Sequence, residues 1–136
     1  MLIFKRDQLK RLTDKAKENL NAAEYLFEVK SYDLSVKRSY FTMFYIACGA
    51  LFTLDLVFDN HNEVLDAFKK HFIDTGIFDA GCYEMLAEAK RYRLNDNNEF
   101  NKDITEETAR RILENAKKFK AEMKKHINQW LDDNPA

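Results

Sequence analysis

Residues 37–52 read KRSYFTMFYIACGALF, and this stretch carries no charge after Arg38. A helix of this composition is apolar nearly all round, so other helices have to cover most of its sides. Gly49 costs such a helix about 1 kcal/mol relative to Ala, and we expect a neighbouring backbone to approach closely there. We expect Phe44 to lie in the core, where its loss would leave a cavity. The stretch therefore predicts the central helix of an α-helical bundle.

Helical periodicity flanks this stretch on both sides. Apolar residues from Leu9 to Phe27 recur at steps of three or four, which predicts a first helix with one apolar stripe. Ser31 or Asp33 can cap the central helix, which should run to about Leu54 and lie antiparallel to the first. Three more helices are predicted: residues 61–72, ended by a left-handed glycine at Gly76; residues 79–94; and a last helix capped by Thr105 that reaches Trp130.

Length and composition bound the architecture. A chain of 136 residues is long enough for one domain with a real core, and we expect a single domain over 1–136 with its core over about 6–131. Three Gly and one Pro leave few turn residues for strands. The predicted fold is all-α, an up-and-down bundle of about five helices around a buried second helix. Eleven Phe and six Tyr predict a further buried surface, such as that of a homodimer.

The charge distribution argues against a protein that coats nucleic acid. The formal charge of −1 divides into +3, −7 and +3 over residues 1–54, 55–107 and 108–136. A balanced total makes bulk DNA binding unfavourable but leaves room for a local basic cleft. We interpret the cations of the last helix as a solvated face that suits the helix dipole, with a phosphate-binding strip as the alternative.

Cellular location and metal binding also have sequence signals. Cys48 and Cys82 have neither metal-ligand spacing nor a disulfide framework, which predicts free thiols in a reducing compartment. Met1 to Phe4 is followed at once by charges, so no secretory signal is expected, and the uncharged run 39–54 is shorter than a membrane span. We expect a cytoplasmic protein with no membrane contact, no metal and no cofactor.

One segment departs from the pattern of core and plain surface. Residues 91–98 read RYRLNDNN and gather two cations and several side-chain amides at the end of a predicted helix. Arg and Asn at a helix C-terminus can simply satisfy its last carbonyls. Arg forks also suit phosphate, and Asn can donate to it. The candidate residues for binding an anion or RNA are Arg91, Arg93, Asn95, Asp96 and Asn97, with Arg38, His61 and Glu99 as weaker candidates.

The order of several short motifs resembles the HEPN domain family, in particular its small stand-alone branch. The stretch RSYFTMF is similar to the family's R-A-Y-Y-A-M-F core helix, and AKRYRLND falls where the family carries an Arg-containing polar segment. The motifs that carry the resemblance are LNAAEYLF at 20–27, SYD at 31–33, RSYFTMF at 38–44, NH at 60–61, HFIDTGIF at 71–78 and AKRYRLND at 89–96.

The resemblance implies a helical homodimer in which the Arg segments of two subunits face one shared cleft. It also implies a setting beside a minimal nucleotidyltransferase or in a defence or toxin–antitoxin system, with nucleotide or RNA in the cleft. Ribonuclease members carry a His after four to six residues beyond the Arg. Here the permitted positions hold Asp96, Asn97 and Asn98 counted from Arg91, or Asn98, Glu99 and Phe100 counted from Arg93.

This departure decides between the alternatives. Metal-free RNA cleavage needs a group that titrates near neutral pH, together with a fixed cation on the phosphate. The missing His favours a non-catalytic, HEPN-like module that binds nucleotide or RNA. A metal-independent endoribonuclease of toxin type, using Asp96 or Glu99 as its base, is the alternative, and a purely structural interaction subunit is the third. We interpret His61 as a hydrogen-bonding residue at a helix terminus.

Overall fold

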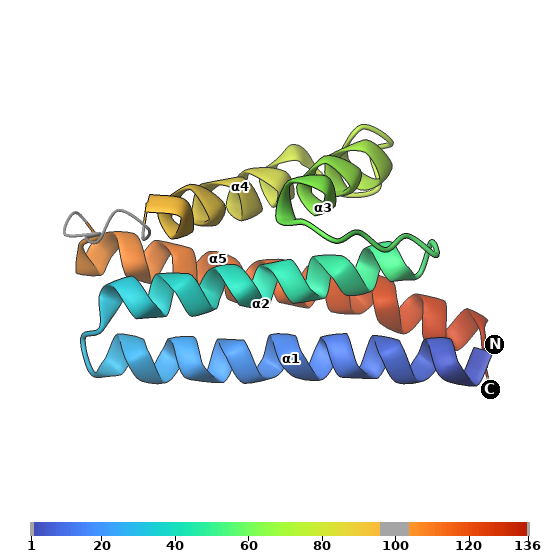
Figure 1. The fold of residues 1–136 in the computed structure, drawn as a ribbon, viewed down its shortest axis with the longest axis horizontal. Coiled ribbons are helices and arrows are strands. Elements are labelled where there is room, and N and C mark those ends of the chain that lie inside the picture. Colours follow the sequence, from blue (N-terminus) through green and yellow to red (C-terminus); the bar gives the residue numbers. More distant parts are fainter. Residues whose placement is uncertain (1, 96–103, 136) are drawn as a thin grey trace.

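The computed structural model describes residues 2–95 and 104–135, and the part of the chain that it describes is a helical bundle (Figure 1). Its elements are α1 (Leu2–Glu28), α2 (Tyr32–Phe52), α3 (His61–Phe68), a π-helical turn (Lys69–Ile73), α4 (Ala80–Asn95) and α5 (Glu106–Asp133). The predicted all-α fold is therefore confirmed. No helix in the described ranges combines the length and the hydropathy that a membrane crossing requires.

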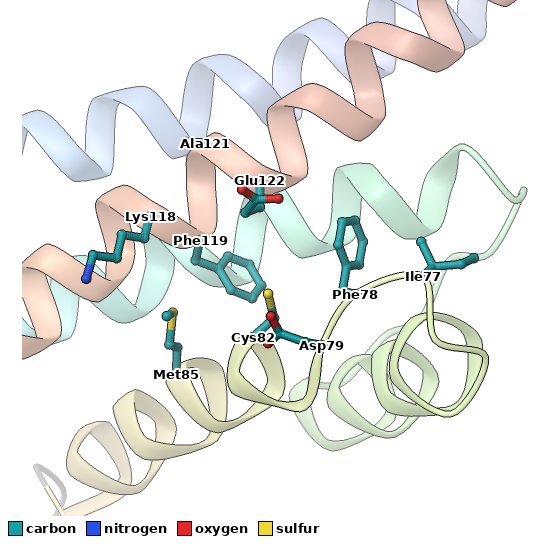
Figure 2. A pocket seen from close by; sticks show the side chains of 9 residues that line it. All are labelled: Ile77, Phe78, Asp79, Cys82, Met85, Lys118, Phe119, Ala121 and Glu122. Atoms are coloured by element: carbon teal, nitrogen blue, oxygen red, sulfur yellow. The ribbon is translucent and has the colours of Figure 1, made fainter.

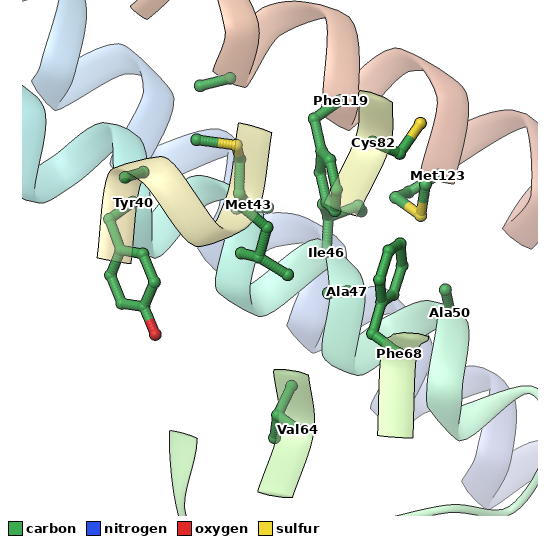
Figure 3. Packing of buried hydrophobic residues seen from close by; sticks show 14 of the residues in the cluster. Tyr40, Met43, Ile46, Ala47, Ala50, Val64, Phe68, Cys82, Phe119 and Met123 are labelled. Atoms are coloured by element: carbon green, nitrogen blue, oxygen red, sulfur yellow. The ribbon is translucent and has the colours of Figure 1, made fainter. Parts of the chain in front are cut away.

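Helix α2 occupies the centre of the bundle, as its composition predicted. Figure 1 shows α1, α2 and α5 running side by side, with α3 and α4 lying across the other face of α2. Met43, Ile46 and Ala47 of α2 are fully buried and pack with Phe68 of α3 and Phe119 of α5 (Figure 3). Since α2 contacts all four of the other helices, the lack of charge in α2 after Arg38 is a packing requirement.

Two expectations about α2 need correction. The space above Gly49 is limited by side chains rather than by backbone, because a Cβ there would lie 3.0 Å from Ile127 Cδ1 and 3.8 Å from Leu12 Cβ. Phe44 is only half-buried, and its ring stacks on that of His61. The fully buried aromatic residue in this turn of α2 is Tyr40.

The helix ends follow the predicted signals in part. Thr105 caps α5 by accepting a hydrogen bond from the Thr108 N–H at 3.1 Å, and Gly76 has the expected positive φ of 80°. Ser31 precedes α2 but makes no capping hydrogen bond with its side chain. Asn60 caps α3 by accepting from the Glu63 N–H at 2.8 Å, which fixes the position of the adjacent His61.

Cations of α5 largely pair with neighbouring carboxylates. Arg111 contacts Glu88 at 2.7 Å, and Lys117 lies 3.4 Å from Glu24 and 3.3 Å from Glu114. These pairs support the interpretation of this face as solvated surface rather than as a phosphate-binding strip.

Candidate functional site

A histidine and a tyrosine meet where α3 begins beside α2. The Tyr40 hydroxyl lies 2.6 Å from His61 Nδ1, and the His61 ring stacks on Phe44 with centroids 3.9 Å apart and planes 8° from parallel. Tyr40 is buried, and its oxygen points away from Met43 and Ile46 (Figure 3). His61 is thus held by one hydrogen bond and one ring face, and no described residue bonds to its Nε2.

An arginine from α4 reaches the same aromatic residues. The Arg93 guanidinium carbon lies 5.7 Å from the centroid of Tyr40 and 5.1 Å from that of Phe41. The ring of His61 lies 5.7 Å and 6.1 Å from the same two centroids. Two groups from different helices therefore share one aromatic support, and we call Tyr40, Phe41, Phe44, His61 and Arg93 the His61–Arg93 cluster.

The hydrogen-bond donors of Arg93 are unused by the described residues. Its Nε is buried without a partner, and no described carboxylate or carbonyl accepts from its guanidinium group. By contrast, Arg110 lies over the Phe27 ring at 5.4 Å and pairs with Glu106 at 2.5 Å. Arg93 lies in the last turn of α4, where the helix dipole favours a cation. The dipole does not explain why the guanidinium group is half-buried without a hydrogen-bond acceptor.

Two further cations, Lys90 and Arg91, precede Arg93 on α4. The Lys90 ammonium donates to Asn62 Oδ1 on α3, beside His61. Arg91 is exposed and borders a shallow hollow of about 290 Å³ with Glu84, Glu88 and Asn115. No ion pair joins Lys90, Arg91 or Arg93 to a described carboxylate. The end of α4 is therefore locally cationic in a chain whose total charge is slightly negative.

The environment favours the uncharged forms of the two titratable rings. Burial lowers the pKa of His61 below its usual 6.5, and the charges of Arg93 and Lys90 lower it further. Burial raises the pKa of the Tyr40 hydroxyl strongly, although the charge of Arg93 opposes this rise. At neutral pH the cluster thus pairs a neutral imidazole with a fixed guanidinium cation.

The predicted site residues separate into three groups. Arg93 lies in the cluster, and His61, a weaker candidate, lies in it too, whereas Arg91 is on the exposed side of α4. Arg38 lies elsewhere and donates from Nη1 to Asn19 Oδ1 of α1 at 3.1 Å. Asp96, Asn97 and Glu99 fall outside the described residues, as does the side chain of Asn95.

Sequence reasoning missed the partners of these residues. Phe44 was assigned to the core, and Tyr40, Phe41 and Lys90 were not among the candidate site residues. A signal existed, because positions 40, 41 and 44 lie on one side of a helix and a fully apolar core does not need a tyrosine hydroxyl there. The hydroxyl position indicated a polar partner outside α2.

A larger hollow has the wrong chemistry for an anion (Figure 2). It measures about 500 Å³ and is lined by residues of α4, α5 and the loop before α4, among them Asp79, Cys82, Lys118 and Glu122. Burial raises the pKa of Cys82 to about 11, so its thiol is not a reactive thiolate at neutral pH. The carboxylates of Asp79 and Glu122 outnumber the one lysine, Lys118, so this hollow repels phosphate. Within the described ranges, no three His, Cys, Asp or Glu side chains form a group that could bind a metal ion.

Comparison with known proteins gives the family. The HEPN domain model matches residues 9–126. The chain is 33% identical over 126 residues to "Putative toxin MJ0142" of Methanocaldococcus jannaschii, an alignment that covers 93% of this chain and 85% of that protein. It is 32% identical over 127 residues to "Putative toxin MJ0605" of the same organism, covering 93% of both chains.

A third relative extends the range of organisms. The UPF0332 protein glr0978 of Gloeobacter violaceus is 30% identical over 109 residues, which cover 79% of this chain and 86% of the relative. The match of the family model, over residues 9–126, spans the helices that build the His61–Arg93 cluster. The chain belongs to the HEPN domain family.

Proposed function

We propose that this protein is an RNA-binding module of a toxin–antitoxin or related defence system. Lys90, Arg91 and Arg93 at the end of α4 bind phosphates of the strand. The observation that carries the proposal is the guanidinium group of Arg93, half-buried on two aromatic rings with no acceptor among the described residues. A guanidinium fork in this state suits a phosphate, which can accept two of its N–H bonds at once.

The aromatic side chains of the cluster extend the proposal to single-stranded RNA. Phe41 and Phe44 are half-exposed and flank the cation. Proteins that hold single strands combine such cations with aromatic faces on which the bases stack. The toxin names of two relatives support the setting but say nothing of this chain's ligand.

Fluorescence anisotropy with a labelled, single-stranded RNA tests this function. Arg93→Ala is expected to weaken binding by about tenfold or more, equivalent to about 1.4 kcal/mol. It should also reduce the slope of log K against log salt by about one. Arg110→Ala is the matched control, because that guanidinium also lies on a ring but has Glu106 as its partner. Binding that is unaffected by Arg93→Ala contradicts the site, and a helical protein that binds no RNA favours the purely structural subunit.

A homodimer is part of the proposal, but through a surface at the other end of the bundle from Arg93, so it would not form the shared cleft of Arg segments that the family resemblance implies. An apolar groove of about 410 Å³ runs between the start of α1, the end of α2 and the following loop, and its lining includes Phe4, Cys48, Phe52 and Val57. Phe4 is 60% exposed and Val57 is 72% exposed, values that leave large side chains open to a second copy. Sedimentation equilibrium should give a dimer that Val57→Lys dissociates, whereas Ile77→Lys, at an exposed apolar residue outside the groove, does not. A monomeric wild-type protein contradicts this part.

Three finer predictions accompany the proposal. They are a nucleotidyltransferase as protein partner, a free nucleotide as an alternative ligand, and a cytoplasmic location. Co-purification from the native host tests the partner, and competition of nucleotides against labelled RNA tests the ligand.

A further inference from the structure

Helices α1 and α5 lie side by side (Figure 1), and we call the boundary between them the α1–α5 seam. In one part of the seam, Lys117 of α5 lies 3.4 Å from Glu24 of α1. Further along α5, Lys124 lines a hollow of about 450 Å³ together with Asp14 of α1. Lys120 comes between these two contacts and on the same side of α5, because residues three or four apart share one helix face. Lys120 therefore lies in the seam, against the part of α1 between Asp14 and Glu24.

The surroundings of Lys120 hold cations but no acceptor. Its side chain is half-buried, and its ammonium group makes no hydrogen bond or ion pair with any residue that the structure describes. Lys17 of α1 and Lys124 of α5 are the charged groups that act on its titration, and both are cations. The acidic side chains along this part of the seam already have other lysines as partners: Asp14 pairs with Lys10 at 2.9 Å, and Glu24 with Lys117 at 3.4 Å.

These surroundings favour the free amine of Lys120. Burial lowers its pKa below the usual 10.5, and the charges of Lys124 and Lys17 lower the pKa further. Burial also acts to lower the pKa of Lys117, which is half-buried too, but the hydrogen bond and charge of Glu114 and the charge of Glu24 raise it above 10.5. An amine is a nucleophile and an ammonium group is not, and desolvation or a neighbouring cation is what activates a nucleophilic lysine.

We propose that Lys120 is an acylation site, whose half-buried amine is modified by acyl phosphates while Lys17 and Lys124 attract the phosphate of the donor. The observation that carries the inference is the position of this amine in the α1–α5 seam, beside two cations and without a carboxylate partner. The site is independent of the proposed RNA binding, because the His61–Arg93 cluster is built from α2, α3 and α4.

The two neighbouring cations select the class of donor. An acyl phosphate carries negative charge directly beside its reactive carbonyl group, so cations next to the nucleophile raise the local concentration of the donor. They also stabilise the charge that the leaving phosphate gains as its bond to carbon breaks. An acyl donor without charge gains neither effect.

The reaction is an aminolysis. The ammonium group of Lys120 first loses one proton to water, and its nitrogen then forms a bond to the carbonyl carbon of the acyl phosphate. The bond from that carbon to the bridging oxygen breaks, and the oxygen keeps the electron pair. The leaving phosphate takes the second proton from the nitrogen. The products are an uncharged amide at Lys120 and hydrogen phosphate, and nothing is oxidised or reduced.

The test compares two lysines of the same seam in one peptide. Folded protein is incubated with acetyl phosphate at neutral pH, and cleavage after Glu114 and Glu122 then releases a peptide that holds both Lys117 and Lys120. Tandem mass spectrometry gives the extent of acetylation at each position over time. Lys120 is expected to react about threefold or more faster than Lys117, its matched control, because more of it is free amine. In urea, where the seam is lost, the two rates should become equal.

Variants test the role of the neighbouring cations. Lys17→Gln combined with Lys124→Gln should lower the rate at Lys120 about threefold or more. Lys118→Gln, at an exposed lysine that lines the hollow beside α4, should leave the rate unchanged. The preference for Lys120 should be smaller with the N-hydroxysuccinimide ester of acetic acid, which is uncharged. Circular dichroism of each variant checks that the helices are intact.

Three results overturn the proposal. Equal rates at Lys120 and Lys117 in the folded protein would show that the seam does not activate the amine. A preference for Lys120 that persists in urea would assign it to the local sequence instead of the fold. A rate at Lys120 that the double variant leaves unchanged would remove the role of Lys17 and Lys124. None of these results bears on RNA binding, which is measured separately with Arg93→Ala.

Discussion

Lys30 lies in the turn after α1 and has a φ of 66°, a backbone conformation that residues with a side chain seldom adopt. The Ser31 N–H donates to the Leu26 carbonyl at 2.8 Å and the Lys30 N–H donates to the Phe27 carbonyl at 3.0 Å. This is the hydrogen-bond pattern of a helix stop in which glycine usually takes the left-handed position. The two hydrogen bonds of this turn, which leads into α2, thus hold Lys30 in a strained backbone conformation.

Lys30→Gly should therefore stabilise the protein. Glycine adopts a positive φ without a Cβ penalty, and the gain should be about 1 kcal/mol after the entropy of the unfolded chain is counted. Urea unfolding followed by circular dichroism measures the change. Lys30→Ala keeps a Cβ in the strained position and should not give this gain, so an equal rise in both variants would point to the lysine charge instead.

His126 makes stability depend on pH. Its Nε2 lies 3.3 Å from Thr53 Oγ1, and its ring makes T-shaped contacts with the rings of Phe72 and Phe78, with centroids 5.2 Å and 5.6 Å apart. Burial lowers its pKa below 6.5. Below pH 6.5 the unfolded chain therefore binds a proton before the native state does, and the stability present at higher pH is lost as pH falls through the folded pKa of His126.

The free energy of unfolding should accordingly fall as the pH is lowered below 6.5. His61 contributes in the same direction, because its pKa is also lowered in the folded state. His126→Gln should flatten the dependence. Stability constant across this pH range in wild type would contradict the buried placement of both rings.

At the scale of the elements, the packing of α3 against α5 supports a cavity prediction. Phe68 is fully buried and lies 5.5 Å from Phe72, 6.2 Å from Phe78 and 5.5 Å from Phe119, measured between ring centroids. Phe68→Ala should cost about 3–5 kcal/mol of stability. Phe44→Ala should cost less, since that ring is half-exposed. Equal losses in urea unfolding would show that Phe44 is part of the core after all.

The helices themselves were predictable because hydrophobic periodicity follows directly from burial. The uncharged stretch in α2 and the stripe of α5 that includes Ile112, Phe119 and Ile127 both indicated their buried faces. The π-helical turn Lys69–Ile73 was not predictable. A π-helical turn holds about one residue more than an α-helical turn, and the spacing of apolar residues in the sequence does not show this difference. The start of α1 at Leu2 was missed because the apolar steps become regular only from Leu9.

At the scale of the whole molecule, the candidate site depends on how α3 and α4 lie against α2. Arg93 was predicted as a site residue because residues 91–98 gather cations and side-chain amides at the end of a predicted helix. Its meeting with His61 was not, because no fixed spacing along the chain joins the start of α3 to the end of α4. Both groups reach Tyr40 only when the bundle is assembled, so a search along the sequence beyond Arg93 could not find this pair.

The two ends of the described chain lie together at the end of the bundle away from the last turn of α4 (Figure 1). Arg6 holds them there, donating from Nη1 to the Leu131 carbonyl at 3.1 Å and to the Asn134 carbonyl at 2.7 Å. A donor and an acceptor dye attached near these ends would thus give strong energy transfer in the native state. Unfolding to a coil with a radius of gyration of about 40 Å would abolish that signal. Such a labelled molecule would report folding in single-molecule traces while the His61–Arg93 cluster, far from both dyes, stays open to RNA.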